Sequence, residues 1–280
     1  MSAVGDSAIT RRARRIPVAA SVVEWEPVRH AASARKLGAL VRESSRFAGA
    51  DLLGLPGVRR YHLRDGGRPV LLRHGTIDMW TFYELFAARV YEPPPPIAAA
   101  LARAGAPRVV DLGANIGMFG LDVLTRHPEA RITAYEPDVR NAAIHRRLIE
   151  LNATPAWQLV EAAAGAADGS VTFLTGQETA SRIVADGAPG SVEVPLVDVL
   201  PELAEADLVK MDIEGGEWPL LADPRIGALR TLILEYHPHG APAEDTERAA
   251  RELLEPHGFE ILPVFHDTGG IGMLWATRAA

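Results

Sequence analysis

The chain has 280 residues, of which 48% are apolar and 23% are charged, so we expect a packed core rather than disorder. Its formal net charge of -7 disfavours nucleic acid and anionic membrane as partners, and the absence of cysteine excludes disulfides and thiolate metal sites. No segment approaches the roughly 20 apolar residues that span a bilayer, and we expect a cytoplasmic protein.

The first part of the chain is predicted to hold a flexible leader and a small α+β segment. The leader, residues 1–20, carries arginines without the apolar stretch of a signal peptide. The segment, residues 21–92, includes two short strands within 58–73 and a helix from Asp78, its predicted N-cap, through Tyr91. The apolar stripe of this helix leaves two interpretations open: the segment only packs on the main domain, or it covers an active site.

Four consecutive prolines predict a stiff connector at residues 92–96, before a main domain at 97–280. In that domain apolar strands alternate with helices, which predicts a mainly parallel sheet buried on both faces. The strands are expected at 108–112, 131–135, 157–162, 207–212 and 230–235. The helices are expected near 117–126, 138–151, 198–204, 216–222 and 244–257, with a short hairpin at 164–175 in the third crossover.

The C-terminal part departs from this alternation. Residues 259–264 and 271–277 form two predicted strands whose connection is too short for a helix, so they pair as an antiparallel hairpin. The predicted fold class is therefore α/β. It is a doubly wound, mainly parallel seven-stranded sheet of Rossmann-like type with a C-terminal antiparallel hairpin, plus the small N-terminal α+β segment.

The strongest local signal is the glycine-rich turn in VVDLGANIGMFG, residues 109–120. Gly113 and Gly117 let the backbone approach a ligand, and the helix that follows offers unpaired N–H groups. Turns that bind NAD look similar. Asp111 distinguishes a turn that binds NAD from one that binds S-adenosylmethionine. Its carboxylate would repel the pyrophosphate of NAD but attract the ammonium and sulfonium of S-adenosylmethionine. A role for Asp111 in capping the turn alone stays open.

The second predicted strand ends in Glu136, within the motif YEPD. In proteins that bind NAD and in those that bind S-adenosylmethionine, a carboxylate at this position accepts hydrogen bonds from ribose hydroxyls. Pro137 ends the strand, and Asp138 or Asn141 begins the next helix. Together with the glycine turn, this spacing predicts a nucleoside ligand.

The third and fourth strands also end in candidate residues. Glu161 and Ala162 are expected where adenine would lie, although a packing role for them is equally open. The fourth strand leads into MDIEGGE, where Asp212 and Glu214 face the crevice in which open sheets bind ligands. The Asn/Asp-Pro-Pro-aromatic tetrapeptide that is typical of nucleic-acid amino methyltransferases is absent, which argues against a nucleobase substrate.

Two histidines, His237 and His239, follow the fifth strand and are candidate bases, because an imidazole titrates near neutral pH. A surface position is the alternative for both. We expect His237 to take the proton of an alcohol acceptor, with Asp212 or Glu214 as alternatives. No metal ligand is assigned, although Asp212, Glu214, His237 and His239 could together hold a cation in a metal-dependent variant.

In this order the motifs resemble the FkbM family of class I S-adenosylmethionine-dependent methyltransferases. The resemblance rests on VVDLGANIGMFG, YEPDVRN, AAAGAADGSVTF, VKMDIEGGEW and LILEYHP, and upstream on GTIDMWTFYELFAARVYEPP. It implies S-adenosylmethionine as methyl donor and O-methylation of a small molecule such as a secondary metabolite or sugar. It also implies that Asp212 and Glu214 lie between cofactor and acceptor. The cofactor-binding residues that we expect are Asp111, Gly113, Ala114, Asn115, Gly117, Glu136, Pro137, Asn141, Glu161, Ala162 and Asp212.

Two other functions stay open. One is an NAD-dependent oxidoreductase that shares the first strand-helix-strand unit, which Asp111 and the C-terminal hairpin oppose. The other is a protein of the same fold that binds the cofactor or a partner without turnover. The expected partner is a small-molecule acceptor, with no nucleic acid and no membrane, and the oligomeric state, a homodimer included, is left open.

Overall fold

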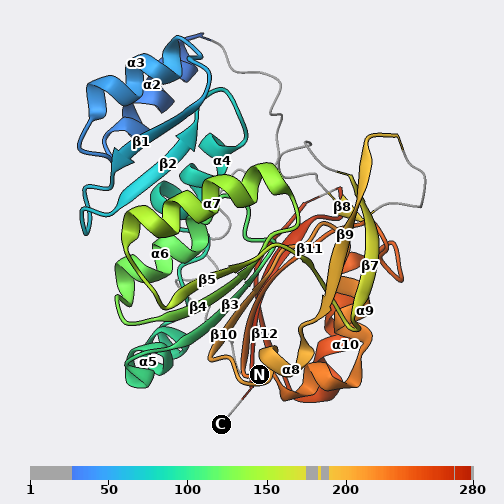
Figure 1. The fold of residues 1–280 in the computed structure, drawn as a ribbon. Coiled ribbons are helices and arrows are strands. Elements are labelled where there is room, and N and C mark those ends of the chain that lie inside the picture. The colour runs from blue at the N-terminus through green and yellow to red at the C-terminus, as the bar shows by residue number, and fades with distance from the viewer. Residues whose placement is uncertain (1–26, 175–181, 184–188, 268, 279–280) are drawn as a thin grey trace, which may run out of the picture.

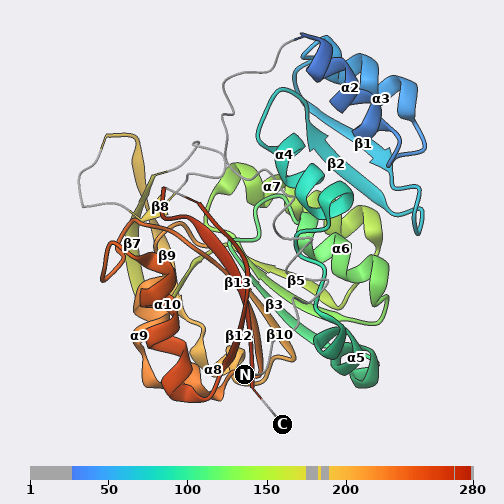
Figure 2. The same ribbon diagram turned by 180° about the vertical axis from the view of Figure 1, so that it is seen from behind.

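The computed structural model describes residues 27–174, 182–183, 189–267 and 269–278, with side chains from residue 33 onward except at 174, 182 and 183 (Figures 1 and 2). The predicted leader lies outside these residues. None of the described helices combines the length and the apolar character needed to cross a membrane.

A seven-stranded sheet forms the centre of the molecule, in the strand order β12-β13-β11-β10-β3-β4-β5 (Figure 1). Five consecutive strands of this sheet are parallel, namely β5, β4, β3, β10 and β11. The strand β13 runs antiparallel to both β11 and β12. This arrangement is the Rossmann-like class I methyltransferase fold, and it confirms the predicted fold class. The strands are β3 Arg108–Leu112, β4 Arg131–Tyr135, β5 Trp157–Val160, β10 Leu208–Met211, β11 Thr231–Tyr236, β12 Glu260–His266 and β13 Gly272–Thr277.

The chain reverses its direction of travel across the sheet between β3 and β10. From β3 it proceeds to β4 and β5 on one side, and it later returns to β10 and β11 on the other. β3 and β10 pair in a register that sets Asp111 opposite Lys210 and Leu112 opposite Met211. Open α/β sheets bind ligands at such a switch point, outside the carboxyl ends of the strands. The loops after β3 and β10 are therefore where this fold places a site.

Alternate residues of the strands feed two hydrophobic cores, one on each face of the sheet. Val109, Leu208 and Ile233 belong to one core, and their neighbours Val110 and Val209 belong to the other. Helices cover both faces (Figures 1 and 2). The first face carries α5 Pro95–Ala104, α6 Met118–Arg126 and α7 Val139–Asn152, and the second carries α8 Leu200–Leu203, α9 Glu217–Ala222, η3 Pro224–Ala228, α10 Thr246–Leu254 and η4 Glu255–His257.

The N-terminal segment is a small α+β unit that packs beside α6 and α7 (Figure 1). Its side chains share one continuous core with the first face of the sheet, because Phe47, Tyr61 and Phe82 belong to the same buried cluster as Leu121 and Leu148. The predicted strand pair is present, but the sequence did not reveal the two helices before it. The elements are α2 Pro27–Gly38, α3 Ser44–Leu52, β1 Val58–His62, β2 Pro69–Arg73, α4 Asp78–Phe82 and the π-helix η1 Tyr83–Ala88.

Two local predictions for this region are wrong. The helix that begins at Asp78 widens into a π-helix and ends at Arg89, which adopts a left-handed conformation with φ 53°. Asp78 does not cap it, because its carboxylate binds Arg73 instead. The proline run is only partly a connector, since α5 already begins at Pro95. Proline fits the first turn of a helix, where its missing N–H has no partner to lose.

A second sheet follows β5, with the order β6-β9-β7-β8. Its strands are β6 Ala163–Gly165, β7 Gly169–Leu174, β8 Arg182–Ile183 and β9 Ser191–Asp198. The hairpin expected at 164–175 is wrong, because β6 and β7 each pair with β9, which lies between them. The third strand of the main sheet also ends earlier than expected, since the chain turns toward this second sheet at Ala163.

Candidate functional site

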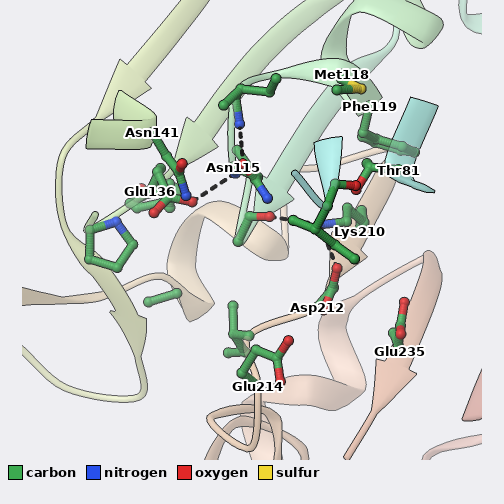
Figure 3. Close-up of a pocket in the computed structure, with 18 of the residues that line it drawn as sticks. Thr81, Asn115, Met118, Phe119, Glu136, Asn141, Lys210, Asp212, Glu214 and Glu235 are labelled. Carbon is green, nitrogen blue, oxygen red and sulfur yellow. Dashed lines mark hydrogen bonds and ion pairs between the residues drawn. The ribbon is translucent and has the colours of Figure 1, made fainter. Parts of the chain in front are cut away.

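A cavity of about 390 Å³ opens at the switch point between β3 and β10 (Figure 3). The loops after β3, β4, β10 and β11 supply one part of its wall. The N-terminal segment supplies another part, and its lining residues are Ile77, Asp78, Trp80, Thr81, Glu84, Leu85 and Tyr91. The segment therefore packs on the main domain and lines the cavity, and its role as the cover of an active site stays a prediction.

The glycine turn after β3 brings the two central loops into contact. Gly113 has φ +74°, and a Cβ there would lie 1.8 Å from the carbonyl oxygen of Asp212. Gly117 has φ +89°, and a Cβ there would lie 2.5 Å from the ring of His145 on α7. Both positions thus require glycine, but for different reasons. Gly113 and Ala114 line the cavity, whereas Gly117 lies behind its wall and lets α6 approach α7.

Glu136 lies at the end of β4 and lines the cavity with Pro137, as the sequence predicted for a nucleoside site (Figure 3). One carboxylate oxygen accepts a hydrogen bond from the backbone N–H of Asn115 (2.7 Å) and the other from that of Asp138 (2.8 Å). Burial raises the pKa of Glu136 to about 7, although these two hydrogen bonds lower it. Each oxygen can accept a further hydrogen bond from a ligand.

Asn141 also lines the cavity, at the start of α7, where it links the main domain to the N-terminal segment. Its Oδ1 accepts a hydrogen bond from Arg73 Nη2 at 2.9 Å. The same guanidinium donates to both oxygens of Asp78, at 2.7 and 2.9 Å, and Asp78 is fully buried. This bidentate pair fixes the geometry of the segment next to the site.

Asp111 does not hold the position that we predicted for it. It is 0% exposed, and the described cavity wall does not include it. Burial raises its pKa, whereas the ammonium of Lys210, 3.5 Å from Oδ1, lowers it. The strand register explains the pair, because Lys210 on β10 stands opposite Asp111 on β3. Asp111 therefore lies behind Lys210, which lines the cavity.

Lys210 is a site residue that the sequence analysis missed. It lines the cavity, donates a 2.8 Å hydrogen bond to the carbonyl of Gly113 and lies 3.3 Å from Asp212 Oδ2. Burial opposes its charge, but Asp212 and Asp111 together raise its pKa, so it stays protonated. A signal was present, because Lys210 is one of only two lysines in the chain and interrupts an apolar strand.

The wall expected from Glu161 and Ala162 is formed by other residues. Glu161 is exposed and pairs with Arg146, and Ala162 is buried without lining the cavity. Ala163, Ala164 and Phe173 line it instead. The shift follows from the early end of β5, which turns the residues after Val160 into the second sheet.

Carboxylates gather at the opposite end of the cavity from Glu136. Asp212 comes from the loop after β10, as predicted, and Glu235 near the end of β11 accepts a 3.1 Å hydrogen bond from the hydroxyl of Tyr91. Glu84 comes from the π-helix, and burial, with Asp212 nearby, raises its pKa to about 7. The sequence analysis did not select Glu84 or Glu235. Burial also raises the pKa of Glu235 well above its usual range.

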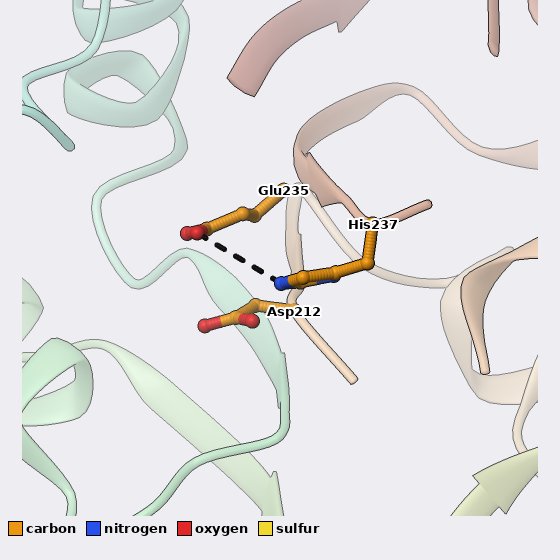
Figure 4. Close-up of side chains that lie close together, drawn as sticks. All are labelled: Asp212, Glu235 and His237. Atoms are coloured by element: carbon orange, nitrogen blue, oxygen red, sulfur yellow. Dashed lines mark ion pairs between the residues drawn. The ribbon is translucent and has the colours of Figure 1, made fainter. Parts of the chain in front are cut away.

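His237 is buried beside these carboxylates (Figure 4). Its backbone N–H and its Nδ1 lie 2.7 and 3.2 Å from Oε1 of the fully buried Glu217, and Nε2 lies 3.5 Å from Glu214 Oε2. Burial lowers its pKa, but the hydrogen bond to Glu217 and the charges of Asp212 and Glu214 outweigh this and raise it to about 10. The imidazole therefore carries a proton at neutral pH, which does not suit the predicted base.

The other predicted histidine, His239, is exposed and lies outside the described cavity wall. The side chains that could hold a metal ion are Asp212, Glu235 and His237, whose ligand atoms all lie within 4.8 Å of one another (Figure 4). This set differs from the predicted one, because Glu235 takes the place of Glu214 and His239.

The charges of the described cavity wall are unbalanced. Five carboxyl groups besides Asp78 lie on it, whereas its cationic groups are Lys210 and His237. Burial raises the pKa of Glu84 and Glu136 to about 7 and that of Glu235 well above its usual range. A cationic ligand would favour the ionised forms of these groups, whereas a phosphate would disfavour them. The carboxylates are Glu84, Glu136, Asp212, Glu214 and Glu235.

No family model matches the chain. It is similar to the AMB antimetabolite synthetase AmbE of Pseudomonas aeruginosa, at 30% identity over 55% of this chain, but it spans only 9% of the length of AmbE. It is also similar to Methyltransferase sdnD of Sordaria araneosa, at 29% identity over 55% of this chain and 74% of the relative. Among solved structures, Methyltransferase FkbM from Methylobacillus flagellatus matches at 16% identity with a TM-score of 0.43, over 89% of this chain and 59% of that one. Membership of the FkbM family stays a prediction.

Proposed function

We propose that the chain is an S-adenosylmethionine-dependent methyltransferase that methylates a hydroxyl group of a small molecule, such as a secondary metabolite or a sugar. The observation that carries the proposal is the negative cavity beside the glycine turn, at the switch point of this fold. A pyrophosphate placed next to Asp212 and Glu214 would be repelled. A nucleoside whose other end bears a sulfonium and an ammonium would be attracted.

The residues of the cavity fit this cofactor. Glu136 offers two carboxylate oxygens to the ribose hydroxyls, and the small side chains of Ala163 and Ala164 are the wall that we propose for adenine. Lys210 and Asp212, which pair at 3.3 Å, present a cation and an anion to the charged amino-acid portion. The cavity volume of about 390 Å³ falls within the range of about 300–1,000 Å³ of sites for small molecules.

S-adenosylmethionine supplies, when bound, a methyl group whose bond to sulfur breaks as the acceptor oxygen bonds to its carbon, the electron pair remaining on sulfur. The chain orients the acceptor and receives its proton. We propose that Asp212 and the protonated His237 hold the acceptor hydroxyl. The carboxylate of Glu214, next to His237 Nε2, takes its proton in place of the imidazole.

The names of the relatives support a role in the chemistry of small molecules. One relative is a methyltransferase, and the other is a synthetase of an antimetabolite. Because the chain spans only a small part of AmbE, the activity of that whole protein is no guide to the acceptor.

Calorimetry with S-adenosylhomocysteine and with NAD tests the cofactor. We expect heat with the first ligand and none with the second. Glu136→Gln should weaken the binding of S-adenosylhomocysteine about 10- to 100-fold, since a charge-assisted hydrogen bond contributes about 1.5–3 kcal/mol. Glu161→Gln is the matched control, because this neighbouring carboxylate is exposed and paired with Arg146, and its affinity should equal that of the wild type. Binding of NAD, or equal effects of the two substitutions, would contradict the proposal.

A second assay separates turnover from binding. Transfer of a labelled methyl group to a panel of hydroxylated small molecules is expected for at least one acceptor class. A protein that binds S-adenosylhomocysteine but transfers no methyl group to any panel member would be a non-catalytic member of the fold.

A further inference from the structure

We propose that the acceptor end of the cavity is a divalent metal site, in which Asp212, Glu235 and Nε2 of His237 are the ligands. The position of this site follows from the side chains alone, whereas its use in catalysis rests on the proposed function. Figure 4 shows the three side chains converging from the ends of two neighbouring parallel strands, β10 and β11. Their ligand atoms lie within 4.8 Å of one another, and His237 Nε2 lies 4.0 Å from Glu235 Oε1.

The imidazole has the orientation of a metal ligand. Its Nδ1 faces the carboxylate of Glu217, which is 0% exposed, so the nitrogen left to face the cavity is Nε2. His237 is 5% exposed, and among the described residues Nε2 has no hydrogen-bond partner, since the nearest carboxylate oxygens lie at 3.5 and 4.0 Å. Histidines that bind metals almost always present their second ring nitrogen to a carboxylate or carbonyl in this way.

The two carboxylate ligands are oriented by the same principle. Glu235 accepts the hydroxyl of Tyr91 at Oε2, which leaves Oε1 on the side of His237. Asp212 holds Lys210 at Oδ2, which leaves Oδ1 to a cation. Each of the three ligands is therefore fixed through its other polar atom by a buried or half-buried neighbour. A loose cluster of surface acids lacks such support.

The donor set indicates the class of ion. Two carboxylates and one imidazole suit divalent cations of intermediate character such as Mn²⁺. Ligands that are neighbours in an octahedral shell of about 2.1 Å radius lie about 3 Å apart, so the 4.0 Å pair has to close by about 1 Å. Three protein ligands leave further positions to water or to the acceptor hydroxyl.

A cation that binds here would displace the Nε2 proton of His237 to solvent, because a metal-bound imidazole nitrogen is deprotonated. In the methyl transfer it would then bind the acceptor oxygen itself, in place of the contacts of that hydroxyl with Asp212 and the protonated His237. That oxygen forms its bond to the methyl carbon while the carbon–sulfur bond breaks and its electron pair stays on sulfur. The hydroxyl proton leaves to Glu214, which is not a ligand in this scheme. The cation would stabilise the alkoxide form of the acceptor and is not consumed in the reaction.

Titration with Mn²⁺ followed by electron paramagnetic resonance tests the site without any assay of activity. Wild-type protein should bind one Mn²⁺, and the bound ion should show magnetic coupling to an imidazole nitrogen. His237→Gln should abolish that coupling. Glu235→Gln should weaken binding about 100-fold, and Glu217→Gln, which only positions the imidazole, about tenfold.

Glu214→Gln is the matched control, because it replaces the same kind of carboxyl group in the same cavity and none of the three ligands. It should change Mn²⁺ affinity less than about threefold, since Glu214 does not ligate the ion and its half-buried carboxylate is partly screened by solvent. Equal effects of Glu214→Gln and Glu235→Gln, a bound ion without nitrogen coupling, or no binding at millimolar Mn²⁺ would each overturn the proposal.

Thermal melts confirm that each variant is folded before its titration counts. Calorimetry with S-adenosylhomocysteine in the presence of a chelator keeps the two proposals apart. Cofactor binding without Mn²⁺ binding would contradict only the proposed metal site. Mn²⁺ binding without cofactor binding would contradict only the proposed function.

Discussion

The two ends of the cavity are built in different ways. At the end that we propose for the cofactor, backbone groups of one turn hold a key side chain: Gly113 and Asn115 belong to this turn, and the amide of Asn115 fixes Glu136. The acceptor end is assembled from distant segments, and side chains hold it, as in the pair of Tyr91 and Glu235. A short motif can thus specify one half of a site, while the other half exists only once the chain has folded.

The largest effect should come from the contact that joins the two ends. Gly113→Ala would place a Cβ 1.8 Å from the backbone of Asp212, at φ +74°. Gly75 has the same φ with no atom within 4 Å of such a Cβ, so Gly75→Ala measures the conformational strain alone. We expect a loss in the free energy of unfolding of about 1 kcal/mol for Gly75→Ala and about 4 kcal/mol for Gly113→Ala. Urea denaturation gives both values. Equal losses would show that the two loops are not in contact.

The second-largest loss of stability should come from breaking the contact between the N-terminal segment and the proposed cofactor end. Arg73→Gln leaves the buried carboxylate of Asp78 without its bidentate partner, and we expect a loss of about 3 kcal/mol. Arg108→Gln breaks an ion pair with Glu205 whose side chains are 52% and 67% exposed, so it should cost less than about 1 kcal/mol. Thermal unfolding of both variants provides the comparison. A cost for Arg73→Gln no larger than that for Arg108→Gln would mean that the segment is only loosely attached.

The pH dependence of stability tests the buried carboxylate of the cofactor end. Burial raises the pKa of Glu136 from 4.5 to about 7, so between these values the folded chain keeps a proton that the unfolded chain releases. Stability therefore falls as pH rises through this window. Relative to Glu136→Gln, which cannot titrate, the wild type should lose about 3 kcal/mol between pH 5 and pH 8. Urea denaturation at the two values measures this, and a pH-independent difference would contradict the burial of Glu136.

The smallest predicted effect concerns the end of the π-helix at the acceptor end. Arg89 closes η1 with φ 53°, and Ala153 closes the regular helix α7 with φ 48°. Glycine adopts this conformation without a Cβ clash, so Arg89→Gly and Ala153→Gly should each add up to about 1 kcal/mol of stability. The free energies of unfolding compare the two helix ends directly. A loss for Arg89→Gly alone would show that its side chain stabilises the π-helical turn.

Local patterns predicted part of the proposed cofactor end. The bounds of β3 and β4 match the expected strands, because a short apolar run between turn residues has few alternatives. Gly113 and Glu136, which follow these strands, line the cavity, and their role in binding a cofactor stays a prediction. The sequence did not predict that Asp111 lies behind the cavity wall, beside Lys210. Lys210 is distant in the sequence, and only the register of β3 and β10 brings the two residues together.

The acceptor end depends on interactions that no short window contains. The π-helix carries Glu84 to the cavity, although periodicity predicted a regular helix there. The same limit applies on the proposed adenine side, where β9 separates β6 from β7, so a local hairpin was predicted where long-range pairs exist. The high pKa of His237 arises from Glu217, Asp212 and Glu214, which converge on it only in the folded chain. Sequence reasoning identified the imidazole and misjudged its protonation.

Hydrogen–deuterium exchange with and without S-adenosylhomocysteine tests the central claim most directly, since it shows where the ligand binds. The account predicts slower exchange in peptides that cover residues 113–119, 135–141 and 210–216, and unchanged exchange in α3, which lies outside the described cavity wall. Protection confined to other regions, or none at a saturating ligand concentration, would contradict it.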